Sequence, residues 1–216
     1  MDRNQIEAAF KKCGAFLQGH FQLSSGLHSP GYLQCALVCQ DPVLCARLCA
    51  ELAKRIPSVH VDAVIGPAMG GIVLAYELAR ALGARPPRFT EVNVTEPSAS
   101  AAPGTRGFFT ERGEDGRMAL RRGFTLNRGE KVVIVEDVMT TGGSAAELIE
   151  IAEAAGAEVI SVVALVDRGG VKRFHGRYHP DALLPVELPT YQAAECPLCK
   201  QGIPLVKPGS RKRPGA

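Results

Sequence analysis

The stretch of this 216-residue chain best equipped for chemistry is "VVIVEDVMTTGGSAAELIE", residues 132–150. Residues 132–135 are all apolar and β-branched, which predicts a strand covered on both faces. Glu136 and Asp137 are therefore expected to emerge at the carboxyl end of that strand. Two adjacent carboxylates in such a position accept hydrogen bonds from sugar hydroxyls or bind a metal ion.

The loop that follows has the features of a phosphate-binding site. Gly142 and Gly143 have no Cβ, so their backbone approaches an anion closely and adopts positive φ without strain. Ser144 and Glu147 have the spacing of a capping box, which predicts a helix that begins near Ser144. Free N–H groups and hydroxyls at a positive helix end bind phosphate. The loop is not a nucleoside-triphosphate P-loop, because the lysine of GxxxxGK[ST] is missing, and it does not match GxGxxG.

The acids and the loop together favour one kind of ligand. Carboxylates repel a phosphate, so Glu136 and Asp137 need a partner of their own, such as a diol or a metal ion. A phosphorylated sugar satisfies both groups, with its phosphate on the glycines and its hydroxyls on the carboxylates. The alternative is an N-capped helix after a strand, with two acids that face water. It leaves the association of acids, threonines and glycines unexplained.

The surrounding pattern predicts an α/β fold. Residues 61–84 indicate a strand, a glycine-rich turn and a helix, and residues 130–170 repeat this order and add a further strand. Short β-branched runs that alternate with helices are typical of a mostly parallel sheet flanked by helices. Ligands of such sheets bind at the carboxyl ends of the strands. Residues 21–38 predict two short strands around a turn rich in Ser, Gly and Pro, and a helix is expected to begin at Asp41.

Composition narrows the class of protein. Apolar residues make up 46% of the chain, as in ordinary globular proteins. No apolar run approaches the roughly 18 residues that cross a bilayer, and the N-terminus lacks a signal-peptide pattern, so we expect a cytoplasmic protein with no membrane partner. The net charge of +3 is too small to indicate a nucleic-acid partner. Seven cysteines without a signal peptide indicate reduced thiols.

We predict one domain over residues 1–216, with two segments that stand apart from its core. Residues 94–106 are rich in Ser, Ala and Pro and precede a β-hairpin expected to turn near residues 114–116, so residues 94–122 are predicted to form a mobile loop and hairpin. Residues 207–216 are predicted to be a flexible basic tail.

These motifs resemble the type I phosphoribosyltransferase family, whose phosphoribosyl-diphosphate loop has the same order of apolar strand, two acids, hydroxyls and glycines. The resemblance narrows to its orotate phosphoribosyltransferases. "FQLSSGLHSPGYLQCA" is similar to their N-terminal hairpin, "IGPAMGGIVLAYELARALG" to their second glycine-rich loop and helix, and "GRMALRRGFTLNRGEKVVIVEDVMTTGGS" to their central region. The match covers roughly residues 5–170. It implies the fold of that family, with a small hood built from residues 1–40 and about 172–200.

The resemblance also implies roles for the matching residues. Glu136 and Asp137 would hold the ribose hydroxyls and form a catalytic set with Arg112 and Arg117. Arg168, in "ALVDRGG", would bind the orotate carboxylate, since a guanidinium pairs with it bidentately; the alternative is a salt bridge to a neighbouring loop. The implied phosphoribosyl-diphosphate contacts are Glu136, Asp137, Val138, Met139, Thr140, Thr141, Gly142, Gly143 and Ser144. The implied orotate contacts are Thr140, Arg168 and Ser25.

The implied reaction is a step of pyrimidine biosynthesis. A pyrimidine nitrogen of orotate displaces diphosphate from the anomeric carbon of phosphoribosyl diphosphate, giving orotidine 5′-monophosphate. The transition state is oxocarbenium-like, so the protein's task is positioning and charge handling. Mg²⁺ would be carried mainly by the substrate diphosphate, and no metal site made by protein side chains is expected. A homodimer with shared active sites is implied, because a loop of this family reaches the neighbouring subunit's site.

Two departures from the family pattern concern positive charge. Some members carry lysine at the positions of Ser24 and Gly70, where it faces the diphosphate. The candidates to replace these lysines are, in order, Arg112, Arg117 and the pair Arg121 and Arg122. The alternative for that pair is a solvated strand end.

Other functions fit parts of the pattern. A purine phosphoribosyltransferase shares the phosphate loop but should lack the N-terminal hairpin and the "LRRGF" region. A regulator that binds phosphoribosyl diphosphate without catalysis normally adds a DNA-binding domain or a basic RNA-binding face. A catalytically impaired paralogue is a third alternative, motivated by Ser24 and Gly70.

Cysteine and histidine pairs near the C-terminus raise the question of zinc. His175 and His179 precede "CPLC", which contains Cys196 and Cys199, and these four residues would make one zinc site if the intervening segment folded back. A single CxxC is weak evidence, however. We therefore favour reduced surface or tail thiols.

Overall fold

The computed structural model describes residues 1–23, 25–83, 104–169, 174 and 176–208. In chain order its elements are α1 (Arg3–Lys12), β1 (Phe16–Gln22), β2 (His28–Leu33), α2 (Ala36–Cys39), α3 (Pro42–Ala53), β3 (Ala63–Pro67), α4 (Gly70–Gly83), β4 (Arg106–Arg112), β5 (Met118–Leu120), β6 (Lys131–Met139), α5 (Gly143–Ala154), β7 (Glu158–Asp167), β8 (Pro180–Pro185), the 3-10 helix η1 (Ala193–Glu195) and α6 (Pro197–Lys200).

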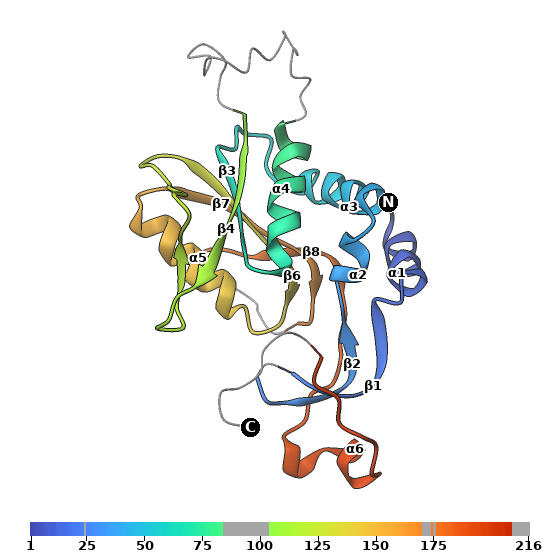
Figure 1. Cartoon of the computed structure of the whole chain (residues 1–216). Coiled ribbons are helices and arrows are strands. Elements are labelled where there is room, and N and C mark those ends of the chain that lie inside the picture. The colour runs from blue at the N-terminus through green and yellow to red at the C-terminus, as the bar shows by residue number, and fades with distance from the viewer. Residues whose placement is uncertain (24, 84–103, 170–173, 175, 209–216) are drawn as a thin grey trace.

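A six-stranded sheet in the order β5-β4-β3-β6-β7-β8 forms the centre of the molecule. Along this order, the strands from β4 to β8 pair in parallel with their neighbours, and β5 pairs antiparallel with β4. Helices α3 and α4 cover one face of this sheet and α5 covers the other (Figure 1). The predicted α/β fold, with a mostly parallel sheet between helices, is confirmed.

Alternation along β6 divides the apolar core into two layers. Val133 and Val135 pack in the layer of α3 and α4, and Val132 and Ile134 pack in the layer of α5. Successive strand residues point to opposite faces, so a strand that is buried on both sides needs a continuous apolar run. Full burial of each such side chain stabilises the fold by about 1.5–3 kcal/mol. Strand β6 is thus a rigid element that carries the two acids near its end.

Helix α3 begins where the sequence predicts. The carboxylate of Asp41 accepts hydrogen bonds from the backbone N–H groups of Val43 and Leu44 at 2.9 and 3.2 Å, which is N-capping. Cys45 and Cys49 on this helix are buried. They act there as small apolar side chains.

A separate two-stranded sheet, β1 with β2, lies beyond the main sheet, and α6 lies next to it (Figure 1). The two strands are antiparallel, with an irregularity in register between Gln18 and Phe21. Together with residues 186–208 they form a unit that we call the hood. The sequence predicts this hairpin within residues 21–38, but β1 begins at Phe16, and residues 36–38 belong to α2.

The C-terminal part of the hood is held by backbone pairing. Val206 forms a parallel bridge with Phe21, and Tyr191 forms an antiparallel bridge with His28. The N–H of Gln22 donates to the carbonyl of Val206 at 2.9 Å. The chain is therefore fixed against the N-terminal hairpin as far along as Val206.

The end of β6 differs from the prediction. The strand continues to Met139, because Val138 and Met139 pair with Val166 and Asp167 of β7. Glu136 and Asp137 are therefore the sixth and seventh residues of a nine-residue strand rather than the first residues after it. The strand holds both carboxylates more rigidly than a loop would.

The remaining expectations concern the hairpin and the polar segments. Strands β4 and β5 form the predicted hairpin, closed by a hydrogen bond from the Gly113 N–H to the Arg117 carbonyl at 2.8 Å. Residues 94–103 of the predicted mobile loop, as well as Ser24 and residues 209–216, lie outside the described residues. No helix in the described ranges combines the length and the apolar character that crossing a bilayer requires.

Candidate active site

The loops after β3, β6 and β7 meet at the carboxyl edge of the sheet and line a cavity of about 460 Å³. The hood forms the opposite wall through its hairpin and through residues 188–208. Parallel sheets bind their ligands at this edge. The cavity is lined by these predicted site residues: Ser25, Glu136, Asp137, Val138, Thr140, Thr141, Ser144 and Arg168.

The two acids sit side by side in a poorly solvated position. Burial raises the pKa of Glu136 well above its usual value, and the neighbouring Asp137 raises it further, while Arg112 lowers it. Burial also raises the pKa of Asp137, although the N–H of Val138 donates to its Oδ1 at 2.7 Å. Hydroxyl donors or a cation from a ligand would stabilise the charged forms of both carboxylates.

Gly70 makes room for the second acid. A Cβ at position 70 would lie 2.1 Å from Oδ2 and 2.4 Å from Cγ of Asp137. Such a contact is far inside van der Waals separation, so any side chain here displaces the carboxylate. Gly70, at a position where some family members carry lysine, thus leaves the space that the Asp137 carboxylate occupies. The loop before it, which lines the cavity, contains a cis peptide between Ala68 and Met69.

The hydroxyl-rich loop leads into α5 by a different route from the predicted one. The N-cap is Gly142, with φ of 73°, and α5 begins at Gly143. The predicted capping box is wrong: Ser144 lies inside the first turn, and no side chain in the described part of the chain caps the helix. The first N–H groups of a helix have no partner within it, so this end of α5 suits an anion.

Glu147 does not cap the helix because its carboxylate has other partners. It accepts a hydrogen bond from the N–H of Met118 at 2.8 Å and forms an ion pair with Arg112 at 3.1 Å. These contacts join α5 to the β4–β5 hairpin. The phosphate-loop helix and the hairpin are therefore mechanically connected.

Met139 lies apart from the cavity-lining residues. Its side chain is 1% exposed and packs in the apolar layer of α5, which leaves its main chain for the predicted ligand contact. Its carbonyl accepts a hydrogen bond from the N–H of Arg168 at 2.9 Å. Gly142 and Gly143 shape the turn without side chains. Their ligand contacts remain predictions.

Arg168 directly follows β7 and contributes its positively charged guanidinium to the cavity. Its Nη2 donates to the hydroxyl of Ser29 on β2 at 3.1 Å, which orients the guanidinium toward the hood side. Burial lowers the pKa of Arg168, but a guanidinium stays charged in proteins. Tyr32 lines the same cavity, and burial, followed by the charge of Asp137, raises its pKa.

The arginines predicted to handle charge belong to the hairpin and lie outside the set of cavity-lining residues. Arg112 is paired with Glu147, and its Nε is buried without a hydrogen-bond partner among the described residues. Arg117 is mostly exposed. Arg122 is paired with Glu111 at 2.8 Å and Arg121 is exposed, as the alternative of a solvated strand end expects. The catalytic roles of these arginines remain predictions.

Several cavity-lining residues were not predicted from the sequence, and two of them carry ionisable groups. Tyr32 lies on β2, and Lys207 lies in the segment predicted to be a flexible tail. Lys207 reaches the cavity because the neighbouring Val206 pairs with Phe21. No local pattern signals such a pairing between distant segments.

The interpretation of both C-terminal cysteines as surface or tail thiols is wrong for one of them. Cys196 is fully buried, and Cys199 is exposed. His175 lies outside the described residues, and His179 is exposed. The histidines that approach the cysteines are His20 and His28 of the hairpin.

Comparisons with known proteins show the family to which this chain is related. A family model described as "Phosphoribosyl transferase domain" matches residues 43–187. "Orotate phosphoribosyltransferase" of Desulforamulus reducens is 49% identical over 212 residues, which are 98% of this chain and 99% of the relative. The protein of the same name from Caldicellulosiruptor bescii is 46% identical over 213 residues, 99% and 100% of the two chains.

Solved structures agree on the fold. The crystal structure of orotate phosphoribosyltransferase from Aeropyrum pernix aligns with a TM-score of 0.59 at 28% identity and covers 84% of this chain and 94% of that one. The enzyme of the same name from Mycobacterium tuberculosis, in complex with Fe(III) dicitrate, aligns with a TM-score of 0.61 at 19% identity and covers 86% and 97%. At this low identity the second likeness concerns the fold alone.

Proposed function

This chain belongs to the phosphoribosyltransferase family, and we propose that its cavity performs the reaction named in its full-length relatives, orotate phosphoribosyl transfer. The enzyme moves the 5-phosphoribosyl group from 5-phospho-α-D-ribose 1-diphosphate to orotate and releases diphosphate and orotidine 5′-monophosphate, a step of pyrimidine biosynthesis. One observation carries the proposal: paired acids, a hydroxyl-rich helix N-terminus and Arg168 line one cavity.

The sugar phosphate is bound by the residues after β6. Thr140, Thr141 and Ser144 offer hydroxyls, and the first turn of α5 offers backbone N–H groups to the 5-phosphate. Glu136 and Asp137 accept hydrogen bonds from the ribose hydroxyls. This assignment matches each ligand group with protein groups of complementary charge.

Orotate is held at the end of β7. The guanidinium of Arg168 pairs with the orotate carboxylate, since a planar fork donates two parallel hydrogen bonds to it. Thr140 and Ser25 lie in the same cavity and are proposed to contact the base. Ser29 positions Arg168 for this task.

The charge of the departing diphosphate requires cations. Mg²⁺ would be carried mainly by the oxygens of the substrate diphosphate, and the hard carboxylate oxygens of Glu136 and Asp137 are compatible with this cation nearby. When bound with the diphosphate, Mg²⁺ supplies positive charge that favours its departure. Lys207 lines the cavity and adds a protein cation. Arg112 is a further candidate, because its buried Nε lacks a partner among the described residues.

A homodimer is part of the proposal. Met69, Val73 and Tyr76 are exposed apolar residues at or near the start of α4, spaced along one side of it. A patch of this kind suits contact with a second copy of the chain. Light scattering on the purified protein tests this; a monomer at assay concentration would contradict it.

The domain limits and the location remain proposals. We propose a single domain with the hood as its subsidiary part; residues 94–103 of the predicted mobile loop and residues 209–216 of the predicted tail lie outside the described residues. A cytoplasmic location agrees with the free state of all seven cysteines.

The decisive experiment offers purified protein, Mg²⁺ and phosphoribosyl diphosphate with orotate, adenine, guanine or hypoxanthine in turn. We expect loss of orotate absorbance and formation of orotidine 5′-monophosphate. Turnover of a purine instead of orotate would establish a purine phosphoribosyltransferase. Tight binding of the sugar diphosphate without turnover of any base would establish a regulator or an impaired paralogue.

A further inference from the structure

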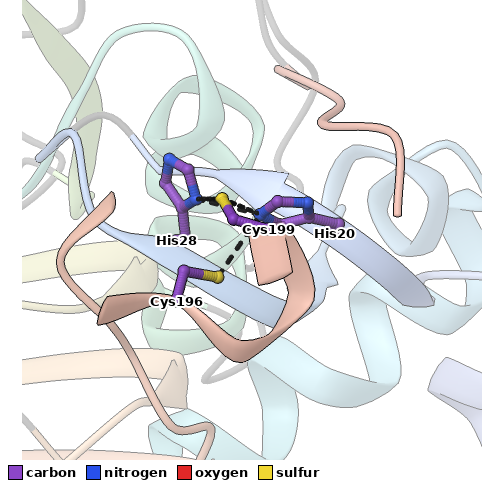
Figure 2. Close-up of side chains that lie close together, drawn as sticks. All are labelled: His20, His28, Cys196 and Cys199. Carbon is purple, nitrogen blue, oxygen red and sulfur yellow. Dashed lines mark hydrogen bonds between the residues drawn. The ribbon is translucent and has the colours of Figure 1, made fainter. Parts of the chain in front are cut away.

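Two histidines and two cysteines meet in the hood, away from the catalytic acids (Figure 2). His20 comes from β1, His28 from β2, Cys196 from the residue before α6 and Cys199 from α6 itself. Their ligand atoms all lie within 4.8 Å of one another. The proposed phosphoribosyl transfer gives this cluster no task.

The distances approach those of a tetrahedral metal site. Zinc bonds of about 2.0–2.1 Å to nitrogen and about 2.3 Å to sulfur place tetrahedral ligand atoms roughly 3.4 Å (N to N) and 3.6 Å (N to S) apart. In the structure, His20 Nε2 lies 2.9 Å from His28 Nδ1 and 3.5 Å from Cys196 Sγ. Cys199 Sγ lies 3.3 Å from His28 Nδ1 and 3.7 Å from His20 Nε2. Small adjustments would accommodate one ion.

The backbone presents these ligands in a defined way. The irregularity between Gln18 and Phe21 makes two successive residues, His20 and Phe21, buried, where a regular strand would turn one of them outward. Cys196 and Cys199 flank the first turn of α6, and the N–H of Lys200 donates to the carbonyl of Cys196 at 3.2 Å. Two cysteines separated by two residues are a common zinc-binding spacing.

A hydrogen bond to a backbone carbonyl determines which ring nitrogen of His20 carries the proton. Nδ1 of His20 lies 2.8 Å from the carbonyl oxygen of Ile203. A carbonyl accepts hydrogen bonds, so Nδ1 carries the proton and Nε2, which faces the cluster, presents a lone pair. Histidines that bind metals are typically oriented in this way by a carbonyl or carboxylate.

Three of the groups in the cluster compete for one acceptor. Nε2 of His20 has one lone pair, yet His28 Nδ1, Cys196 Sγ and Cys199 Sγ all lie within hydrogen-bonding range of it. One acceptor cannot satisfy three donors. The two histidines are 2% and 3% exposed and Cys196 is fully buried, so water supplies little compensation. A cation at the common focus would satisfy all four at once.

We propose that His20, His28, Cys196 and Cys199 bind one zinc ion that fastens the hood. Two imidazoles and two thiolates in a tetrahedral arrangement are a zinc ligand set. All four positions are occupied by protein groups, so the ion has a structural role. It joins the N-terminal hairpin to the segment that carries Lys207 to the cavity. This site replaces the alternative built on His175 and His179.

The first test measures metal in the full chain, purified without chelator under reducing conditions. We expect about one zinc per chain by elemental analysis. Cys199→Ser, chosen because Cys199 is exposed, should lose most of this zinc, and His20→Ala should do the same. Cys13→Ser and His60→Ala are matched controls outside the cluster and should retain it. Zinc below about a tenth of a mole per chain in the unaltered protein, also after added zinc and dialysis, would overturn the proposal.

The second test needs no substitution, so it does not depend on the folding of a variant. Alkylation followed by peptide mass spectrometry should show Cys199 protected in the zinc-loaded protein and reactive after chelation, with Cys13 unchanged. Cobalt added to the stripped protein should give thiolate charge-transfer bands and the strong visible absorption of tetrahedral cobalt. A disulfide between Cys196 and Cys199 would refute the zinc site. Equal alkylation of Cys199 before and after chelation would refute it as well.

Discussion

The carboxyl edge of the sheet and the hood face each other across one cavity, yet they are stabilised by different means. The acids stand on β6, whose apolar residues are buried in two aliphatic layers. The hood buries His20, His28 and Ser29 instead, and its segments are joined by backbone bridges between distant parts of the chain. The acids proposed to act in catalysis are thus placed by nonspecific packing of β-branched residues, whereas the opposite wall depends on a few specific polar contacts.

The largest expected effect comes from removing a charge on the sheet side. Asp137→Asn should lower kcat/KM by about 100-fold, because a hydrogen bond to a charged group contributes about 1.5–3 kcal/mol. Steady-state assays with both substrates measure this. Circular dichroism should show an intact fold. Asp181→Asn is the control, because Asp181 lies on β8 and forms a surface ion pair with Arg55. Near-normal activity of Asp137→Asn would contradict the ribose-binding role.

A smaller loss is expected when the same carboxylate is displaced rather than neutralised. Gly70→Ala places a Cβ 2.1 Å from Oδ2 of Asp137, and misplacement of a catalytic group by about 1 Å costs up to roughly 100-fold. We expect a kcat lower by about 10- to 50-fold, within that limit. Gly83→Ala at the other end of α4 meets its nearest atom at 3.8 Å and should change nothing. Equal activities for the two variants would show that Asp137 tolerates movement.

The hood side should contribute less. Lys207→Ala should raise the KM for phosphoribosyl diphosphate by roughly 3- to 10-fold, the effect of one hydrogen bond of about 1 kcal/mol. Lys200→Ala on α6 is the matched control, because Lys200 is exposed and does not line the cavity. If Lys207→Ala leaves the KM unchanged, the hood closes the cavity without supplying charge.

The smallest effect concerns stability and pH. Burial raises the pKa of Glu136 above its ordinary value of 4.5. The folded chain therefore binds more protons than the unfolded chain above that value, and stability falls as pH rises toward the folded-state pKa. Glu136→Gln should melt at a higher temperature than the unaltered protein at neutral pH, and the difference should shrink below pH 4.5. Glu150→Gln, exposed on α5, should show no such trend. A lower melting temperature for Glu136→Gln at neutral pH would contradict a raised pKa for the Glu136 carboxyl.

The sheet side was largely predictable because its signals are local. The strand, the acids, the hydroxyls and the helix lie within residues 132–150, and the α/β fold follows from repeats of that order. The sequence predicts an end of β6 that is four residues early, because the apolar run stops at the two carboxylates, whereas pairing with β7 continues past them. The capping box failed because Glu147 finds partners on the hairpin.

The hood was less predictable because its contacts join distant segments. The zinc hypothesis from sequence took the histidines nearest to "CPLC" along the chain, but the residues that approach it are His20 and His28. Their signal was two histidines eight residues apart, one directly before the predicted hairpin of residues 21–38 and one within it. Lys207 had no local signal at all, because its position follows from the pairing of Val206 with Phe21.

The bridge between Phe21 and Val206 also orders events during synthesis. A ribosome extends the chain from the N-terminus, so the β1–β2 hairpin emerges long before its C-terminal partner exists. The sheet and its two apolar layers are complete in sequence by residue 185, while the hood must wait for the segment that follows. Nascent chains arrested after β8 should therefore present a folded core with an open binding edge, because the hood is completed last.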